Sequence, residues 1–125
     1  APLVVSCNRG RIKQVLVNLI RNAVDAMHDS ERRELLIAVV ARDGEVEIYV
    51  SDTGVGIAAE MMGDLFTPFV TTKDVGKGLG LGLSISYRIV TDLGGTLRAN
   101  NLPHGGACFV VRLPLMDKPQ EGNDD

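Results

Sequence analysis

Apolar and polar residues recur at helical spacing over residues 11–27, and this pattern predicts the first helix of the chain. At about 100° per residue, the polar side chains fall inside one stripe about 100° wide, and nearly all other positions are apolar. The stripe consists of Arg11, Gln14, Asn18, Arg21, Asn22 and Asp25. We therefore expect a helix that is buried on most sides and shows only a narrow polar strip to solvent or a ligand.

Two strands are predicted at 35–41 and 45–50, after a charged segment at 28–34. Arg42-Asp43-Gly44 joins them, and Asp-Gly is a common hairpin turn. Further strands are predicted at 3–7, 96–100 and 107–113, and helices at 59–65 and 83–93. The segment 66–82 is predicted to be a long irregular loop, and loops of this length usually carry function.

The predicted order of elements is β-α-β-β-α-loop-α-β-β. The hairpins need antiparallel pairs, and the apolar sides of the helices must be buried against another element. The sequence therefore predicts an α+β fold, a two-layer α/β sandwich with a mixed, mostly antiparallel five-stranded sheet and about three helices packed on one face. Residues 1–115 are expected to form one domain, and the polar residues 116–125 a disordered tail.

Composition narrows the function classes. The formal net charge of −3 argues against nucleic acid as the main partner. No apolar run approaches the roughly 20 residues that a spanning helix needs, so direct membrane contact is not expected. Two cysteines are too few for a metal framework and are expected to be buried thiols. His28 and His104 lie in predicted loops without a recognisable serine or cysteine partner, which disfavours nucleophilic catalysis.

Glycine and leucine alternate in the run Gly-Lys-Gly-Leu-Gly-Leu-Gly-Leu at 76–83, just before a predicted helix. Such a turn places free N–H groups and the positive end of the helix dipole together, which favours a bound phosphate. A flexible loop that binds nothing is the alternative. The run is not a Walker A loop, because Gly-x-x-x-x-Gly-Lys-Ser/Thr does not occur in the chain.

Polar residues elsewhere suggest the other parts of a nucleotide site. Asn18 and Asn22 lie one helical turn apart, and amide oxygens are hard neutral ligands suited to Mg²⁺. Asp52 ends a predicted strand and precedes Gly54 and Gly56, so its carboxylate could accept a hydrogen bond from an amine such as adenine N6. Aspartate and glycine are also the commonest turn residues, so this signal alone is weak.

The segment Phe-Thr-Pro-Phe-Val-Thr-Thr-Lys at 66–73 combines apolar rings with a positive charge. Phenylalanines exposed in a loop would be unusual, so we expect these rings to dock on something. Thr72 supplies a hydroxyl and Lys73 an ammonium group, both suited to phosphate oxygens.

These four segments, in this order and spacing, resemble the catalytic and ATP-binding domain (HATPase_c, Bergerat-type) of two-component sensor histidine kinases over residues 3–115. Asn-Leu-Ile-Arg-Asn-Ala at 18–23 is similar to the N box of that family, and Asp-Thr-Gly-Val-Gly-Ile at 52–57 to its G1 box. The F box matches 66–69 and the G2 box 78–85, with one extra Gly-Leu unit. The run at 71–86 is similar to C4-dicarboxylate transport sensor kinases of the nitrogen-sensor branch.

The resemblance implies ATP and Mg²⁺ as ligands. Asn22 would bind the metal, Asn18 would support the metal and phosphates, and Asp52 would bind the adenine amine. Residues 67–82 would form a mobile lid over ATP. The implied ATP-binding residues are Asn18, Asn22, Asp52, Gly54, Gly56, Ile57, Thr72, Lys73, Gly78, Leu79, Gly80, Leu81, Gly82 and Leu83.

The activity implied by the resemblance is transfer of the γ-phosphoryl group of ATP to a histidine on a separate dimerisation domain, upstream of a response regulator. No catalytic residue is expected within this chain, because the phosphoacceptor motif of the family does not occur and His28 is followed by Asp-Ser-Glu. The chain is then expected to bind ATP without phosphorylating itself. It would be a cytoplasmic domain of a bacterial inner-membrane sensor kinase.

Three alternatives remain open. ATPases of the same fold, as in type II topoisomerases, mismatch-repair proteins and a heat-shock chaperone, carry a glutamate one turn before the metal asparagine to activate water. Here Asn18, a neutral amide, occupies that position and cannot serve as a base. The others are a serine kinase acting on an anti-sigma partner and a non-catalytic nucleotide-binding module.

Overall fold

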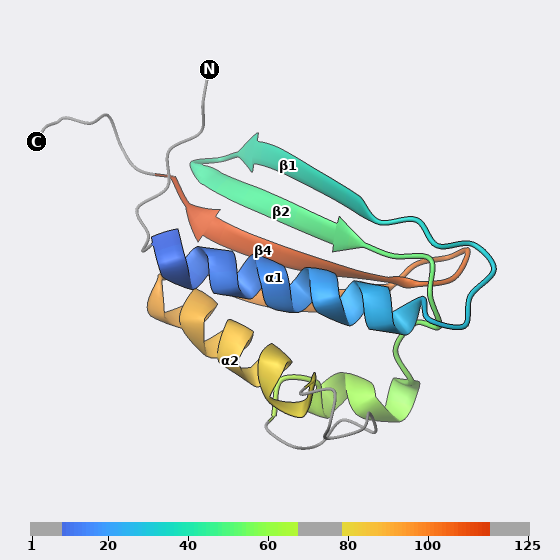
Figure 1. Cartoon of the computed structure of the whole chain (residues 1–125). Helices are drawn as coiled ribbons and strands as arrows, with labels where there is room; N and C mark the ends of the chain where they lie inside the picture. Colours follow the sequence, from blue (N-terminus) through green and yellow to red (C-terminus); the bar gives the residue numbers. More distant parts are fainter. Residues whose placement is uncertain (1–8, 68–78, 116–125) are drawn as a thin grey trace, which may run out of the picture.

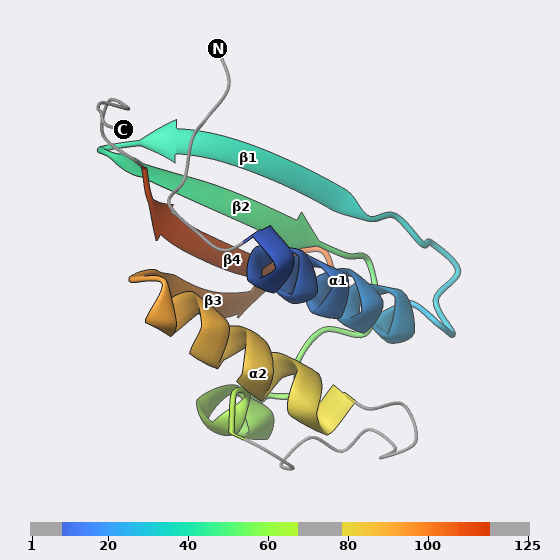
Figure 2. The ribbon, with the colours of Figure 1, turned by 60° about the vertical axis from the view of Figure 1, so that its left-hand side comes forward.

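The computed structural model describes residues 9–67 and 79–115 of the 125-residue chain. The described elements are α1 (Arg9–Ala26), β1 (Leu36–Arg42), β2 (Glu45–Ser51), the short 3₁₀ helix η1 (Ala59–Asp64), α2 (Leu79–Asp92), β3 (Thr96–Asn101) and β4 (Ala107–Pro114). The four strands form one sheet in the order β1-β2-β4-β3, with every neighbouring pair antiparallel. Helices α1 and α2 lie across the same face of this sheet (Figures 1 and 2).

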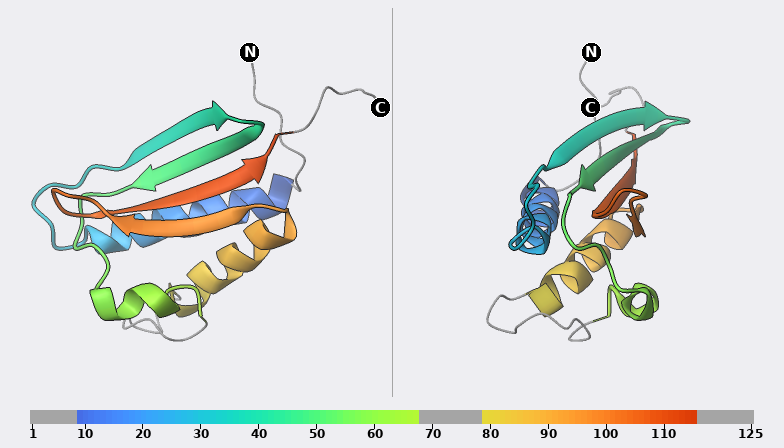
Figure 3. Two further views of the ribbon diagram at one scale, coloured as in Figure 1. Left: turned by 180° about the vertical axis from the view of Figure 1, so that it is seen from behind. Right: turned by 90° about the vertical axis from the view of Figure 1, so that its right-hand side faces the viewer.

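Side-chain alternation along the central strands divides the sheet into a core face and an open face. Val46 and Val50 of β2 and Phe109 and Val111 of β4 point toward the helices and are buried. Helices α1 and α2 complete the core with the buried apolar residues Val15, Leu19, Leu83, Ile89 and Val90. No described helix covers the opposite face, as the view from behind shows (Figure 3). Burial of one apolar face by two helices is what fixes this two-layer arrangement.

The predicted two-layer α/β sandwich is confirmed, with differences in detail. Within the described residues the sheet has four strands and is fully antiparallel. The predicted fifth strand at 3–7 and the tail at 116–125 lie outside the described residues. The predicted Asp43-Gly44 hairpin turn joins β1 and β2. None of the described helices is long and apolar enough to cross a membrane.

Helix α2 begins at Leu79, whereas the sequence pattern predicted an irregular loop up to Gly82. Glycine disfavours a helix interior by about 1 kcal/mol relative to alanine, so the glycine run looked non-helical. Tertiary contacts override that preference here. Leu83 is buried in the core, and the backbone carbonyl of Gly82 accepts a hydrogen bond from Asn18 of α1. The second half of the glycine run therefore forms the first turn of a helix.

The expectation that α1 is buried on most sides was wrong. Val17 and Val24 are 41% and 55% exposed, while Asn22 inside the predicted polar stripe is only 7% exposed. The reason is the position of the helix over the sheet. Its apolar surface is wider than the surface that the core can cover, and its polar stripe faces inward at one end rather than toward solvent.

A carboxylate is buried on the face of the sheet opposite the helices. Glu47 is only 4% exposed, and its Oε2 accepts hydrogen bonds from Nη2 and Nε of Arg112 at 2.7 and 3.1 Å. The hydroxyl of Tyr49 donates to Oε1 at 2.9 Å. Glu47 and Arg112 are register partners on β2 and β4, so this pair joins the two central strands. The hydrogen bonds from Arg112, and then from Tyr49, hold the pKa of Glu47 below its ordinary value of 4.5.

Because the folded chain has the lower pKa, the stability that Glu47 contributes is fully present above about pH 4.5 and is lost as the pH falls through that lower pKa. We expect Glu47→Gln to lower the thermal unfolding midpoint at pH 7, and the difference from the unmodified chain to shrink at pH 3. Circular dichroism melts at both pH values measure this. Glu60→Gln, at an exposed carboxylate, is the control. An undiminished difference at pH 3 would contradict the assignment.

Candidate functional site

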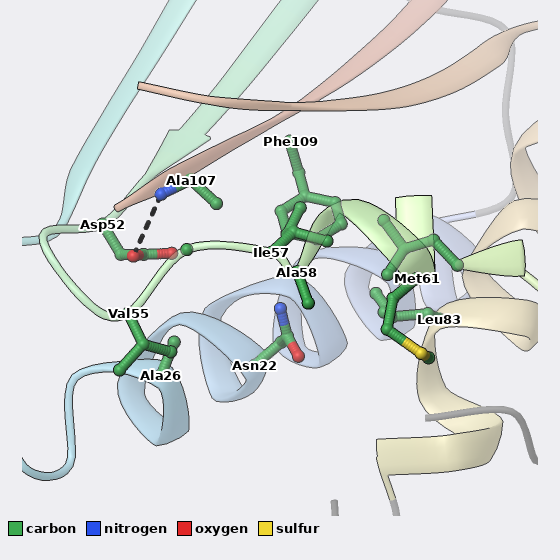
Figure 4. Close-up of a pocket in the computed structure, with 12 residues that line it drawn as sticks. Asn22, Ala26, Asp52, Val55, Ile57, Ala58, Met61, Leu83, Ala107 and Phe109 are labelled. Atoms are coloured by element: carbon green, nitrogen blue, oxygen red, sulfur yellow. Dashed lines mark hydrogen bonds between the residues drawn. The ribbon is translucent and has the colours of Figure 1, made fainter. Parts of the chain in front are cut away.

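A pocket of about 370 Å³ opens between the two helices, η1 and the ends of β2 and β4 (Figure 4). Part of the pocket wall is apolar, and two polar side chains, Asn22 and Asp52, also line the pocket. The lining residues are Asn22, Ala26, Asp52, Val55, Gly56, Ile57, Ala58, Met61, Leu65, Leu83, Ala107 and Phe109. Five of these lining residues belong to the site predicted from sequence: Asn22, Asp52, Gly56, Ile57 and Leu83.

Asp52 follows β2 directly and is 1% exposed. Its Oδ1 accepts hydrogen bonds from the backbone N–H groups of Gly54 at 2.8 Å and Ala107 at 3.3 Å. The backbone N–H of Asp52 in turn donates to the carbonyl of Ala107 at 2.9 Å. Among the described residues, no donor is bonded to the other carboxylate oxygen. The carboxylate is thus fixed by the backbone through one oxygen and can accept a hydrogen bond from a ligand through the other.

The loop after Asp52 lies against the end of α1. The N–H of Val55 donates to the carbonyl of Ala26 at 3.1 Å. A Cβ atom at Gly54 would lie 2.3 Å from that same carbonyl oxygen, so only glycine permits this approach. Gly56 has a φ of 79°, a conformation that other residues rarely adopt. The two glycines of the predicted Asp-x-Gly-x-Gly pattern are therefore required by contact and by backbone conformation.

The far end of this loop is held by a residue that the sequence pattern did not indicate. Asn101 accepts a hydrogen bond from the N–H of Ile57 at 2.7 Å and donates one to its carbonyl at 2.8 Å. Asn101 ends β3, and an asparagine before a turn is so common that its position alone carries no signal. Only the fold brings it to Ile57.

Asn22 projects from α1 into the pocket, opposite Asp52 and the apolar wall (Figure 4). Its side chain makes no hydrogen bond to any other described residue, although it is more than nine-tenths buried. An unpaired buried amide is unfavourable unless a ligand completes its bonding. An amide oxygen suits Mg²⁺, and no cluster of three His, Cys, Asp or Glu side chains occurs in the described part of the chain. Asn22 therefore fits a Mg²⁺ that takes its other ligands from phosphate and water.

Asn18, one turn earlier on α1, does not line the pocket. Its Nδ2 donates to the carbonyl of Gly82 at 3.3 Å and to Oγ of Ser86 at 3.2 Å, both on α2. Ser86 is fully buried, so this contact lies between the helices. Asn18 thus joins the helix that carries Asn22 to the first turns of the helix that follows the glycine run.

Phe66 docks against other side chains of its own domain, in line with the expectation that the rings of this segment dock on something. Its ring stacks on that of Tyr87 with centroids 5.2 Å apart, and meets Phe109 edge-on at 6.5 Å. Phe109 lines the pocket, so Phe66 and Tyr87 support the apolar wall from behind. Both contacts lie in the range preferred by aromatic pairs.

The other residues of the predicted ATP site fall into two groups, one within the described residues and one outside them. Leu79, Gly80, Leu81 and Gly82 form the start of α2. Thr72, Lys73 and Gly78, together with most of the predicted lid, lie outside the described residues. Sequence reasoning missed the other wall residues, which are Ala26, Val55, Ala58, Met61, Leu65, Ala107 and Phe109. The two on β4 follow from strand alternation, but nothing in the sequence indicates that β4 lies beside Asp52.

The protein family described as histidine kinase-, DNA gyrase B-, and HSP90-like ATPase matches residues 7–117. Among curated proteins, the chain is 46% identical over 115 residues to the sensor protein FixL of Bradyrhizobium diazoefficiens, covering 91% of this chain and 22% of FixL. It is 45% identical over 106 residues to the C4-dicarboxylate transport sensor protein DctB of Rhizobium meliloti, covering 85% of this chain and 17% of DctB. The chain thus spans about a fifth of the length of these relatives.

Solved structures agree with this match. The catalytic domain of histidine kinase ThkA superposes with a TM-score of 0.78 at 37% identity, covering 88% of this chain and 70% of that domain. Full-length ShkA in complex with AMPPNP gives a TM-score of 0.74 at 31% identity, covering 91% of this chain and 23% of ShkA. The family predicted from the four boxes is therefore confirmed, as is the likeness to the nitrogen and C4-dicarboxylate sensor branch. This chain belongs to the histidine kinase-, DNA gyrase B- and HSP90-like ATPases, as a catalytic domain of the sensor histidine kinase type.

Proposed function

We propose that this domain binds Mg-ATP in the pocket beside Asp52 and donates the γ-phosphoryl group to a histidine on a separate dimerisation domain. The observation that carries the proposal is the buried Asp52 carboxylate, one oxygen of which is held by backbone donors. The other oxygen can accept a hydrogen bond from the exocyclic amine of adenine. Ile57, Met61 and Phe109 supply the apolar surfaces that a purine ring needs.

The phosphates would extend from the adenine toward Asn22 and the start of α2. Within the described residues α2 begins at Leu79, and the first N–H groups of a helix have no partner inside the helix, so those of α2 would suit phosphate oxygens. Asn22 would hold the Mg²⁺, which neutralises phosphate charge when bound. ShkA, of which a part covering 23% resembles 91% of this chain, has been solved with the adenine nucleotide AMPPNP.

Phosphoryl transfer requires positioning and charge neutralisation rather than a nucleophile from this domain. A ring nitrogen of the acceptor histidine would attack the γ-phosphorus, forming a P–N bond while the P–O bond to ADP breaks. The imidazole proton would leave to water or to a base outside this chain. The dimerisation domain would come from the same kinase, and a response regulator would receive the phosphoryl group next. We place the domain in the cytoplasm as part of a bacterial membrane-anchored sensor kinase.

The geometry around Asn18 favours the kinase over an ATPase of the same fold. Such an ATPase needs a base beside the metal residue to activate water. Asn18 is a neutral amide, and its nitrogen is already bonded to Gly82 and Ser86 of α2. Asn22 is buried and has no hydrogen-bond partner among the described residues, which argues against a degenerate module, since such a module would not need an amide that suits a metal. No described contact favours a serine substrate over histidine.

Asp52→Asn should weaken ATP binding by about 10- to 100-fold, because an amide N–H₂ facing the adenine amine replaces a charged acceptor. Isothermal titration calorimetry measures the loss, with circular dichroism to verify folding. Asp64→Asn, at an exposed carboxylate outside the pocket, is the matched control. Equal ATP affinity in the Asp52 variant and the unmodified chain would refute the placement of the adenine beside Asp52.

Asn22→Ala should abolish most of the Mg²⁺ dependence of ATP binding, since it removes the amide oxygen that fits the metal. Titrations of ATP with Mg²⁺ and with EDTA give that dependence for both proteins. Adenosine, which carries no phosphate, should bind the variant and the unmodified chain alike. A variant that keeps the full Mg²⁺ effect would place the metal elsewhere.

The chain incubated alone with Mg²⁺ and γ-³²P-labelled ATP should acquire no label, because the acceptor histidine lies on another domain. Label should appear on a histidine-containing dimerisation domain added as a separate polypeptide, and it should be labile to acid, as phosphohistidine is. Stable label on the chain itself would overturn the assignment. Release of inorganic phosphate without any acceptor would favour the ATPase.

A further inference from the structure

Asn101 holds one peptide unit of the pocket wall through both polar ends of its side chain. Its Oδ1 accepts a hydrogen bond from the N–H of Ile57 at 2.7 Å, and its Nδ2 donates to the carbonyl of Ile57 at 2.8 Å. A primary amide offers an acceptor and a donor side by side, so it can pair with both backbone groups of one residue. Asn101 itself does not line the pocket and acts on it only through Ile57.

The same β-hairpin holds both ends of the loop at 52–57. Asn101 of β3 and Ala107 of β4 are register partners at the end of the sheet. Ala107 bonds to Asp52 at the start of the loop, and Asn101 bonds to Ile57 at its end. The same hairpin therefore fixes Asp52 at one end of the loop and Ile57 at the other.

The backbone at Gly56 fits closely around Asn101. A Cβ atom at Gly56 would lie 2.9 Å from Oδ1 of Asn101, which is closer than side-chain contacts allow. Glycine is thus needed at position 56 for two reasons. It can adopt the φ of 79°, and it leaves room for the side-chain amide of Asn101. The end of the loop at Gly56 and Ile57 is thus shaped around this one side chain from another strand.

We propose that Asn101 is a positioning residue for the adenine-binding slot, which it holds open at the distance from Asp52 that the base requires. This inference rests on the proposed binding of ATP beside Asp52. Without Asn101 the loop can occupy other conformations, and a ligand must then order it on binding, which weakens affinity. The hydrogen bonds from Asn101 lie on the solvent side, so water can replace them when the slot is empty. Folding should therefore depend on Asn101 much less than binding does.

Two variants and two ligands test this. Asn101→Ala removes both hydrogen bonds. Asn101→Asp keeps the size of the side chain and the acceptor for the Ile57 N–H, but sets a carboxylate oxygen against the Ile57 carbonyl. Asn100→Ala is the matched control, one residue earlier on the same strand and exposed. The full ¹⁵N-labelled chain is titrated with ATP and with adenosine, and NMR chemical shifts recorded at each step give the dissociation constants, including weak ones. Adenosine is uncharged, so the added negative charge of the aspartate variant does not repel it.

We expect Asn101→Ala to weaken ATP and adenosine by the same factor, about 5- to 10-fold, because the change acts on the base and not on the phosphates. Asn101→Asp should weaken adenosine at least as much. Both variants should unfold within about 4 °C of the unmodified chain, and Asn100→Ala should bind normally. Amide hydrogen exchange should become faster at 54–58 but not within α1.

The outcomes separate this inference from the proposed function. If the unmodified chain binds neither ligand, the assignment of the pocket to ATP fails. If it binds both and the Asn101 variants bind them equally well, the positioning role fails while ATP binding stands. Loss of affinity for ATP with adenosine binding unchanged would also overturn it, since the effect would then lie at the phosphates. A large fall in unfolding temperature with unchanged exchange at 54–58 would make Asn101 a folding residue only.

Discussion

The buried carboxylate of Asp52 is the constraint on which the rest of this domain depends. A charge removed from water is costly unless hydrogen bonds replace its hydration. Here the donors are backbone N–H groups from Gly54 and from Ala107, the first residue of β4. Because backbone donors cannot move independently, β4 must begin where it does and the loop after β2 must turn where it does. The pocket follows from meeting these two requirements.

The second requirement is that two helices converge on the same pocket from one side of the sheet. Helix α1 brings Asn22 and helix α2 brings its first turn, while Asn18 bonds the two helices together through Gly82 and Ser86. The order of the four strands places β4, which carries Ala107 and Phe109, at the centre of the sheet beneath both helices. Apolar burial thus determines where the helices lie, and a few polar contacts determine how the site between them is shaped.

Much of this could be predicted from sequence, because the signals are local. Periodicity located α1, the β1–β2 hairpin and the closing strands, and the spacing of the four boxes identified the family and the two polar residues of the pocket. What could not be predicted depends on contacts between distant segments. The start of α2 was misplaced because Leu83 and Asn18 stabilise a turn that glycine disfavours. The exposure of Val17 and Val24 depends on how α1 lies on the sheet, and the role of Asn101 depends on which strand ends beside Ile57.

The contact between Gly54 and the end of α1 has a consequence for how such a domain can diverge. At Asp52 the constraint is chemical, because the side chain must offer an acceptor to the N–H groups of Gly54 and Ala107. At Gly54 the constraint is purely steric, since even one added carbon would lie 2.3 Å from the carbonyl oxygen of Ala26. Another acceptor side chain at position 52 can meet the chemical constraint without moving the backbone, whereas any side chain at position 54 requires the loop and the end of α1 to move apart. Gly54 is therefore harder to replace than Asp52, although it has no side chain.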